Sequence, residues 1–182
     1  MAGKSDARVR YTQHALKQAL LTLLKEKSVN KITVKEVCEL AELNRATFYS
    51  HYSDCFALLE AIENELLEAF AQSLTLIKSF DVAALLEAIY DMIGKNEEAC
   101  RVLIFQNPGS PVIHRMIDYA RPQSIAYWRQ ELCASDEELE MLYTHLSNGL
   151  MHVVVEGYDR YERETVVRFV RRIVQASLSL FR

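Results

Sequence analysis

Hydrophobic residues recur along most of this chain three and four positions apart, which is the spacing of one face of an α-helix. Between residues 8 and 27, for example, Leu16, Leu20 and Leu23 fall on one face. No run alternates between apolar and polar residues as a half-buried strand does, and the nearest, residues 153–155, lies within a helical pattern. The spacing therefore predicts an all-α protein with about nine helices.

Capping residues, Gly and Pro place the ends of these helices. The expected helices cover residues 8–27, 34–41, 45–52, 54–78, 81–93, 96–106, 112–132, 135–157 and 164–181. Gly94 is expected to close the fifth of them and Asn96 to cap the sixth. Residues 107–111, rich in Pro and Gly, form the clearest loop, and Pro122 is expected to break or kink the seventh helix.

Two short helices joined by a tight turn are predicted between residues 33 and 52. Thr33-Val34-Lys35-Glu36 has the form of a capping box, in which side chains at both ends bond to free backbone N–H groups. Glu42 and Leu43 form the turn, and Asn44 is a preferred N-cap for the second helix. This arrangement is a helix-turn-helix, the motif that places its second helix in the major groove of DNA.

The second of these helices turns many polar side chains outward. Phe48 and Tyr52 lie four residues apart and are expected to be buried together. The side chains that must then face outward are Arg45, Thr47, Tyr49, Ser50 and His51. Residues of these types contact phosphates and base edges in DNA complexes. The alternative is that they only cap and solvate a surface helix.

Residues 10–62 resemble the DNA-binding domain of the TetR family of transcriptional regulators. The resemblance is carried by Thr33-Val34, by Ala41, by Leu58-Leu59 and above all by residues 44–52, Asn-Arg-Ala-Thr-Phe-Tyr-Ser-His-Tyr. It covers about a third of the chain. It implies a three-helix DNA-binding domain, a dimer, and a helical domain with a pocket for a small-molecule effector.

The family resemblance identifies the residues expected to contact a double-stranded DNA operator. They are Thr33, Lys35, Asn44, Arg45, Thr47, Tyr49, Ser50 and His51. Arg45 and Thr47 are the expected base contacts, Asn44 lies at the helix N-terminus, and the others are expected to bind phosphates.

Two residues depart from the family pattern. Glu42 stands in the turn where the family often has Gly, and a non-Gly residue in left-handed geometry costs about 1 kcal/mol or more. Cys55 stands at the start of the fourth helix, where the family usually has a Lys that contacts phosphate. The second departure puts one electrostatic contact with DNA in doubt.

Charge is distributed unevenly along the chain. Residues 1–52 carry nine Lys and Arg against five Asp and Glu, a net charge of +4, whereas residues 53–182 carry twelve against twenty, a net charge of −8. A basic N-terminal module suits an anionic partner such as DNA. Together with the motif, this division predicts a helix-turn-helix domain over residues 1–53 and a helical ligand-binding and dimerisation domain over residues 54–182.

The last two expected helices are apolar around more of their circumference than surface helices need to be. Gly149 and Gly157, eight residues apart, are positions where backbones can approach closely. These features predict a homodimer that forms through the last two helices. The alternative is that both are central core helices of a monomer.

Catalytic and metal-binding patterns were not recognised. The sequence has no HExxH, GxSxG or Gly-rich phosphate-binding motif, and its four Cys have no metal-ligand spacing. His145 and His152 share a helix face but lie about 10 Å apart, too far to bind one ion. We therefore expect no metal, no cofactor and no enzymatic activity. Cys55 or Cys133 as a redox sensor is an alternative to an inert thiol.

Aromatic residues and Met of the C-terminal helices are at spacings typical of a core, although the family resemblance implies a pocket there. Tyr127, Trp128 and His152 are the residues expected to line it. The chain contains no apolar run long enough to span a membrane, and no signal peptide is recognised. A cytoplasmic protein with no membrane contact is expected.

These observations predict a sequence-specific DNA-binding transcriptional regulator, acting as a ligand-responsive repressor. A homodimer would bind a palindromic operator, with two recognition helices in successive major grooves about 34 Å apart. The alternative, which Glu42 and Cys55 favour, is a helical ligand-binding or protein-interaction module that has lost DNA binding. The two differ in the salt dependence of DNA binding, which is steep only for the regulator.

Overall fold

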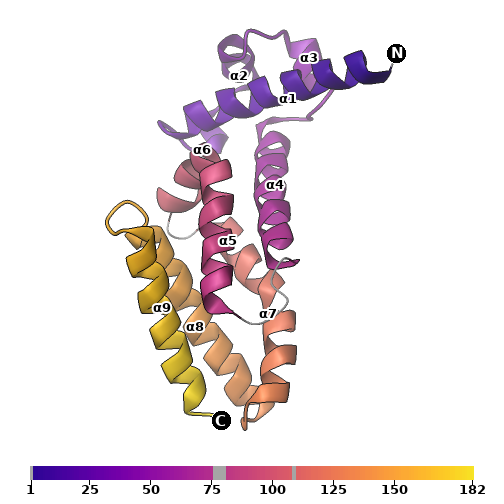
Figure 1. The fold of residues 1–182 in the computed structure, drawn as a ribbon. Helices are drawn as coiled ribbons and strands as arrows, with labels where there is room; N and C mark the ends of the chain where they lie inside the picture. The colour runs from indigo at the N-terminus through magenta and orange to yellow at the C-terminus, as the bar shows by residue number, and fades with distance from the viewer. Residues whose placement is uncertain (1, 76–80, 108–109) are drawn as a thin grey trace. The chain divides into compact units, whose positions relative to one another are not determined.

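The structure, a computed structural model, describes residues 2–75, 81–107 and 110–182, and the regular structure in these ranges is entirely helical (Figure 1). The elements in chain order are α1 (Ala2–Leu24), the 3-10 helix η1 (Val29–Lys31), α2 (Val34–Leu40), α3 (Arg45–Tyr49), α4 (Cys55–Thr75), α5 (Val82–Lys95), α6 (Glu97–Cys100), the π-helix η2 (Arg101–Phe105), α7 (Pro111–Glu131), α8 (Asp136–Gly157) and α9 (Arg163–Ser179). The predicted all-α fold is confirmed, with nine α-helices in the described ranges.

The chain divides into two compact units, which we call the head, ending at Glu65, and the body, beginning at Leu66. Helix α4 therefore starts in the head and ends in the body. The boundary expected between residues 53 and 54 lies within the head, just before α4, and the division into two functional domains stays a prediction.

The head is built around apolar side chains from its α-helices, among them Leu16, Leu20 and Phe48, which the sequence predicts to face inward. Leu16 and Leu20 of α1, Val37 of α2, Phe48 of α3 and Leu58 of α4 are each fully buried. Helix α2 lies against both α1 and α3. One apolar cluster therefore fixes α3, and its outward face is available to a partner.

The body packs its long helices against one another. Helix α8 lies beside α7 and α9, and α5 lies beside α9 (Figure 1). Its fully buried side chains include Leu86 of α5, Met116 of α7, and Leu139 and Val154 of α8. Val154 is thus a core residue of α8.

Stacked aromatic and cationic side chains hold the corner between α8 and α9. The rings of Tyr90 and Tyr158 stack with their centroids 5.6 Å apart. The guanidinium of Arg163 lies 5.3 Å from the Tyr90 centroid and that of Arg101 lies 5.8 Å from the Tyr158 centroid. Asp159 accepts two hydrogen bonds from Arg101, at 2.8 and 2.9 Å. This cluster joins α5, η2, α8 and α9.

Several helix ends differ from expectation. Helix α1 begins at Ala2 rather than near residue 8. Asn96 does not cap the next helix through its side chain, because its amide donates backward to the carbonyl of Met92, at 2.9 Å. Helix α5 accordingly continues through Gly94 to Lys95, and the expected sixth helix is a short α-helix followed by the π-helix η2.

Helix α7 runs without a break through Pro122. A proline removes the N–H that would bond to the carbonyl four residues earlier, here that of Asp118. Both Asp118 and Pro122 are exposed, so water can satisfy that carbonyl, and buried side chains such as Ile117 and Ile125 hold the helix to the core on both sides. Expected helical residues 76–78 and loop residues 108–109 lie outside the described residues.

Candidate nucleic-acid interface and body cavity

Helix α2 starts with the capping box that the sequence predicts. The Thr33 hydroxyl accepts a hydrogen bond from the Glu36 N–H at 3.3 Å, and the Glu36 carboxylate accepts one from the Thr33 N–H at 2.9 Å. The ammonium of Lys27 also donates to Glu36, at 2.5 Å. These hydrogen bonds, that from Lys27 first, lower the pKa of Glu36 to about 2. Thr33 is therefore a structural cap before any contact with DNA.

The turn between α2 and α3 requires a left-handed residue, and Glu42 supplies it with φ 55°. The N–H of Leu43 donates to the carbonyl of Cys38 at 2.9 Å and that of Glu42 to the carbonyl of Glu39 at 3.3 Å. These two bonds form a Schellman motif, in which Gly is the usual left-handed residue. The turn thus keeps the geometry that a Gly would give, and Glu42 bears the backbone strain.

Helix α3 is capped at its N-terminus by Asn44. The side-chain oxygen of Asn44 accepts a hydrogen bond from the Thr47 N–H at 2.7 Å and another from the Thr47 hydroxyl at 3.0 Å. The Ser50 hydroxyl donates to the carbonyl of Thr47 at 2.7 Å. Both hydroxyl protons are used within the helix, so Thr47 and Ser50 can only accept hydrogen bonds from DNA.

The expected outward side chains differ in how far they are exposed. Arg45, Tyr49 and Ser50 are exposed, with Tyr49 at 58%, whereas Thr47 and His51 are half-buried. Phe48 is fully buried, as expected, but its expected partner Tyr52 is only half-buried, with ring centroids 6.0 Å apart. Arg45 and Tyr49 are therefore the two long side chains that α3 presents to solvent.

Lys35, on the first turn of α2, is the remaining expected contact. Its ammonium lies 3.6 Å from the Glu39 carboxylate, and both side chains are more than 60% exposed. A surface ion pair of this kind contributes about 0–1 kcal/mol. Lys35 can therefore exchange Glu39 for a phosphate at little cost.

At the start of α4, Cys55 offers no cationic group to a phosphate. Its side chain is buried, and burial raises the pKa of the thiol. Asp54 caps α4 by accepting a hydrogen bond from the Ala57 N–H at 2.8 Å. The carboxylate of Asp54 thus occupies a helix N-terminus that would otherwise attract a phosphate.

The body contains an apolar cavity of about 80 Å³ between its helices. The described side chains around it come from α4, α5, α7, α8 and α9, and none of these is charged: they include Phe70, Leu74, Leu85, Ile89, Met116, Ala120, Ser124, Trp128, Tyr143, Ser147 and Val174. The lining would favour a neutral, largely apolar occupant, because an ion would lose its hydration there.

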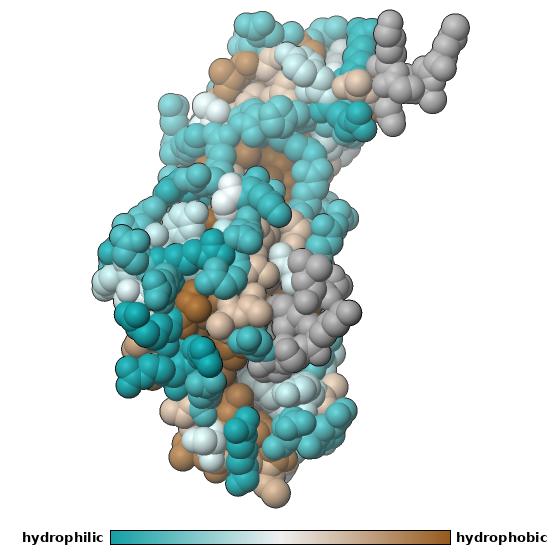
Figure 2. Space-filling model, viewed as in Figure 1, coloured by the Kyte–Doolittle hydropathy of each residue, from teal (hydrophilic) through white to brown (hydrophobic). Residues whose placement is uncertain are grey.

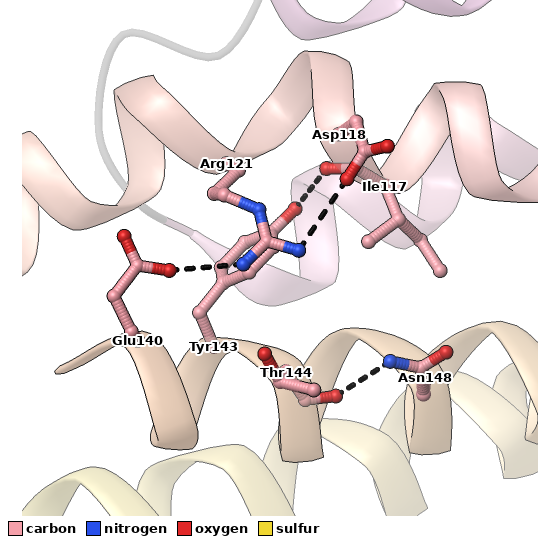
Figure 3. Close-up of polar contacts among 7 residues, drawn as sticks. All are labelled: Ile117, Asp118, Arg121, Glu140, Tyr143, Thr144 and Asn148. Carbon is pink, nitrogen blue, oxygen red and sulfur yellow. Dashed lines mark hydrogen bonds and ion pairs between the residues drawn. The ribbon is translucent and has the colours of Figure 1, made fainter. Parts of the chain in front are cut away.

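Two polar side chains that line the cavity, Tyr143 and Ser124, form hydrogen bonds within the body (Figure 3 shows that of Tyr143). The Tyr143 hydroxyl donates to the carbonyl of Ile117 at 2.5 Å, and burial raises its pKa to about 12. Arg121 lies across the Tyr143 ring, 5.1 Å from its centroid, and bonds to Glu140 at 2.9 Å and Asp118 at 3.4 Å. The Ser124 hydroxyl donates to the carbonyl of Ala120 at 3.0 Å.

The three residues expected to line a pocket are not brought together. Trp128 is buried and lines the cavity. Tyr127, its neighbour on α7, is 40% exposed and is not part of the lining, because adjacent helical residues point about 100° apart. His152 is exposed and borders a different hollow beside α7 and α8, together with His114 and Glu156. Of the three, only Trp128 lines this cavity, and ligand binding by Tyr127, Trp128 and His152 stays a prediction.

The cysteines and acidic groups provide no evident reactive centre in the described part of the chain. Cys38, Cys55 and Cys100 are buried, and burial raises the pKa of each thiol, to about 12 for Cys100. Cys133 is exposed. Within residues 2–75, 81–107 and 110–182, no three His, Cys, Asp or Glu side chains are grouped to hold a metal ion, and no helix is long and apolar enough to cross a membrane.

Comparison with known proteins gives one curated relative and many similar structures. No family model matches the chain. It is 36% identical over 59 residues to the uncharacterized HTH-type transcriptional regulator YxbF of Bacillus subtilis (strain 168), a match that covers 32% of this chain and 16% of the relative. The chain therefore spans less than a fifth of that relative's length.

The solved structures match nearly the whole chain. A TetR transcriptional regulator from Streptococcus agalactiae 2603V matches with a TM-score of 0.69 and 21% identity, over 96% of this chain and 99% of that one. A transcriptional regulator from Aquifex aeolicus VF5 matches with a TM-score of 0.62 and 16% identity, over 91% and 98%. The structure has the fold of TetR-family transcriptional regulators, and the resemblance predicted from residues 10–62 is confirmed at the level of the fold.

Proposed function

We propose that the protein is a sequence-specific DNA-binding transcriptional regulator that inserts α3 into the major groove of a palindromic operator. The observation that carries the proposal is the outward pair Arg45 and Tyr49 on a helix whose start is fixed by the Asn44 cap and the Schellman turn. A fixed helix bearing a guanidinium that forms no ion pair or hydrogen bond with the described residues suits contact with a guanine edge. The similarity to regulators and the +4 charge of residues 1–52 support it.

Arg45 is expected to contact a base, and the other outward residues to position the helix. The Tyr49 hydroxyl, Lys35 and the half-buried His51 would bind phosphates, and Thr47 and Ser50 would accept hydrogen bonds. Phosphate contacts fix register without carrying sequence information. The specificity of the regulator would then rest mainly on the N-terminal turn of α3.

The regulator would act as a homodimer through α8 and α9, which lie side by side in the body. Hydrophilic side chains cover much of the body, with hydrophobic ones between them (Figure 2). On α9, Phe169 and Ile173 are 52% and 47% exposed at helical spacing, and Leu180, just after the end of the helix, is 81% exposed. On α8, Gly149 is exposed and a side chain there would meet no atom within 4 Å. This apolar and open face supports pairing with a second copy.

The apolar cavity of the body is where a small effector would bind. Helix α4 contributes Phe70 and Leu74 to the lining, and the same helix supplies Leu58 to the core of the head. Occupation of the cavity would bias α4 and thereby the affinity for DNA. We propose that the unliganded dimer represses by occupying its operator and that the effector releases it. Such a protein would work in the cytoplasm with the chromosome, and no enzymatic activity is proposed.

The buried Cys55 and the Asp54 cap favour a second candidate, a helical interaction module without DNA binding. The test is to select bound duplexes from a randomised DNA library at two salt concentrations and to measure their affinity. A regulator retains an inverted repeat, and its affinity falls steeply with salt as counterions are released. Failure to retain any sequence at either salt concentration would support the interaction module.

The Arg45→Ala variant, measured in the same binding experiment, tests whether Arg45 contacts a base. It is expected to weaken binding by about 1–3 kcal/mol and to relax the preference at one base pair of each half-site. Arg129→Ala removes the same charge from an exposed ion pair of α7, 2.9 Å from Asp136, and should leave affinity nearly unchanged. An Arg45→Ala variant with the wild-type sequence preference would contradict the assigned base contact.

A further inference from the structure

The outward face of α3 contains a further exposed residue, Ala46, beside the expected DNA contacts. At about 100° per residue, Arg45, Ala46, Tyr49 and Ser50 fall within an arc of about 140°. All four are exposed, whereas Phe48 on the other side is fully buried. Ala46 therefore lies in the middle of the face that the proposed function turns toward DNA.

The four side chains on this face differ in which groups remain available for contact with a partner. The Ser50 hydroxyl proton is bound to the Thr47 carbonyl, and the Tyr49 ring packs edge-on against Phe48, 5.6 Å between centroids. Arg45 makes no ion pair or hydrogen bond with the described residues. Ala46 offers a single methyl group with no polar atom. The start of α3 thus presents a guanidinium group, from Arg45, next to a methyl group, from Ala46.

We propose that Ala46 is a specificity-determining residue that packs against the 5-methyl group of a thymine next to the guanine bound by Arg45. The inference rests on the proposed function and names the base step that it selects. Residues at the N-terminus of a recognition helix are those that reach base edges. Arg45 and Ala46 are its first two residues, so they face neighbouring base pairs.

Thymine is the base that the chemistry of Ala46 selects. In the major groove each base shows a distinct pattern of donors and acceptors, and thymine alone carries a methyl group. A side chain without donors or acceptors cannot bond to the other edges, and it would leave them without water. The small size of Ala46 also lets the start of α3 approach the floor of the groove, where a longer side chain would hold it away.

The experiment removes the methyl from the DNA and from the protein separately. In the operator duplex selected above, each thymine is replaced singly by deoxyuridine, which changes only the 5-methyl group. At one thymine position per half-site, the replacement is expected to lower the affinity of the protein for the duplex about fourfold. This factor corresponds to the loss of one buried methyl group. A second pair, cytosine against 5-methylcytosine at that position, should show a gain of similar size from the methyl.

The protein side of the cycle uses Ala46→Gly, and the readout is the ratio of affinities for thymine and deoxyuridine duplexes within each variant. Any general weakening of α3 by Gly cancels in that ratio. The ratio should fall to about one at the sensitive position in Ala46→Gly and stay near four in Ala57→Gly, a change at a half-buried position of α4 in the head.

Two results would overturn the inference while leaving the proposed function intact. In one, the operator is bound specifically but no thymine is sensitive to loss of its methyl. In the other, a thymine is sensitive and remains so in Ala46→Gly, which would assign the contact to another side chain such as Tyr49. Failure to select any DNA sequence would overturn the proposed function itself, and the inference with it.

Discussion

Single residues of the helix-turn-helix have dual roles, because the groups expected to bind DNA also build the motif. Thr33 and Asn44 cap α2 and α3 before they can contact a phosphate, and Glu42 holds the left-handed position of the turn. Each of these roles belongs to one side chain or one φ angle. Substitutions at this scale should therefore change stability in directions that the local geometry fixes.

Glu42→Gly is expected to stabilise the protein. A non-Gly residue at φ 55° is strained, and Gly removes the strain while giving up some unfolded-chain freedom, so the net gain is up to about 1 kcal/mol. The midpoint of thermal or urea unfolding measures it. Glu39→Gly, inside α2, is the matched control and should destabilise by about 1 kcal/mol. Equal losses in both variants would show that Glu42 is not strained.

Glu36 gives the head a stability contribution that depends on pH. Its pKa of about 2 in the folded protein lies below the ordinary 4.5, so the folded state binds fewer protons and is favoured above pH 4.5. That advantage is lost as the pH falls from about 4.5 to about 2. Glu36→Gln keeps the capping-box form and should be less stable than the wild type at pH 7.

Urea unfolding at pH 7 and at pH 3 measures this difference. The difference in the free energy of unfolding between wild type and Glu36→Gln should be smaller at pH 3 than at pH 7. At pH 3 the stabilisation that ionised Glu36 gives the folded state is partly lost. Glu60→Gln, at an exposed position of α4, controls for general loss of a carboxylate. If this difference in the free energy of unfolding is the same at both pH values, the hydrogen bonds from Lys27 and Thr33 to ionised Glu36 are not its source.

At the scale of elements, the proposed dimer would cover the exposed faces of α8 and α9, whereas a monomer leaves them in contact with solvent. Of the two glycines expected to allow close approach, Gly157 is packed within the chain, where an added Cβ would lie 3.3 Å from a Val166 methyl. Gly149 is open and exposed. Only Gly149 is therefore free to meet a partner helix.

Gly149→Leu should leave the folded chain intact and weaken the proposed dimer. Replacing Gly within a helix gains on the order of 1 kcal/mol of helix propensity, but a leucine would hold a second copy away. Sedimentation equilibrium of the variant should give a larger fraction of monomer than the wild type. Gly94→Leu is the matched control, since Gly94 also lies in a helix with no atom within 4 Å of an added Cβ. Equal dimer affinities in both variants would exclude α8 around Gly149 from the interface.

At the scale of the whole molecule, the proposed regulation couples the body cavity to DNA affinity through α4. The absence of charge among the described lining residues predicts that neutral probes such as toluene or indole raise the unfolding midpoint and lower DNA affinity, whereas benzoate does neither. Ala120→Leu fills the cavity and should abolish the response. Ala126→Leu, exposed on the same helix, should keep it. A response to benzoate equal to that to toluene would contradict an apolar effector site.

Much of the fold could be predicted because its local and tertiary preferences agree. Helical spacing placed Leu16 and Leu20 inside, and the capping box at Thr33 and the cap at Asn44 formed as their residue types predict. The DNA-contact residues were harder to predict, because hydrogen bonds within the head decide which side-chain groups remain available to DNA. The Thr47 hydroxyl was expected to contact a base, and its proton is bound to Asn44. Ala46 was not expected as a contact, since its residue type signals only a helix.

The sequence by itself determined the all-α class, the two short helices of the motif and the left-handed demand on Glu42, because these depend on residue type and spacing over a few positions. The tertiary structure decided that α7 continues through Pro122, that η2 is a π-helix and that Trp128 lines a cavity while Tyr127 does not. Those outcomes depend on packing between helices distant in the chain. Packing energy there exceeds the local preference of a single proline or aromatic residue.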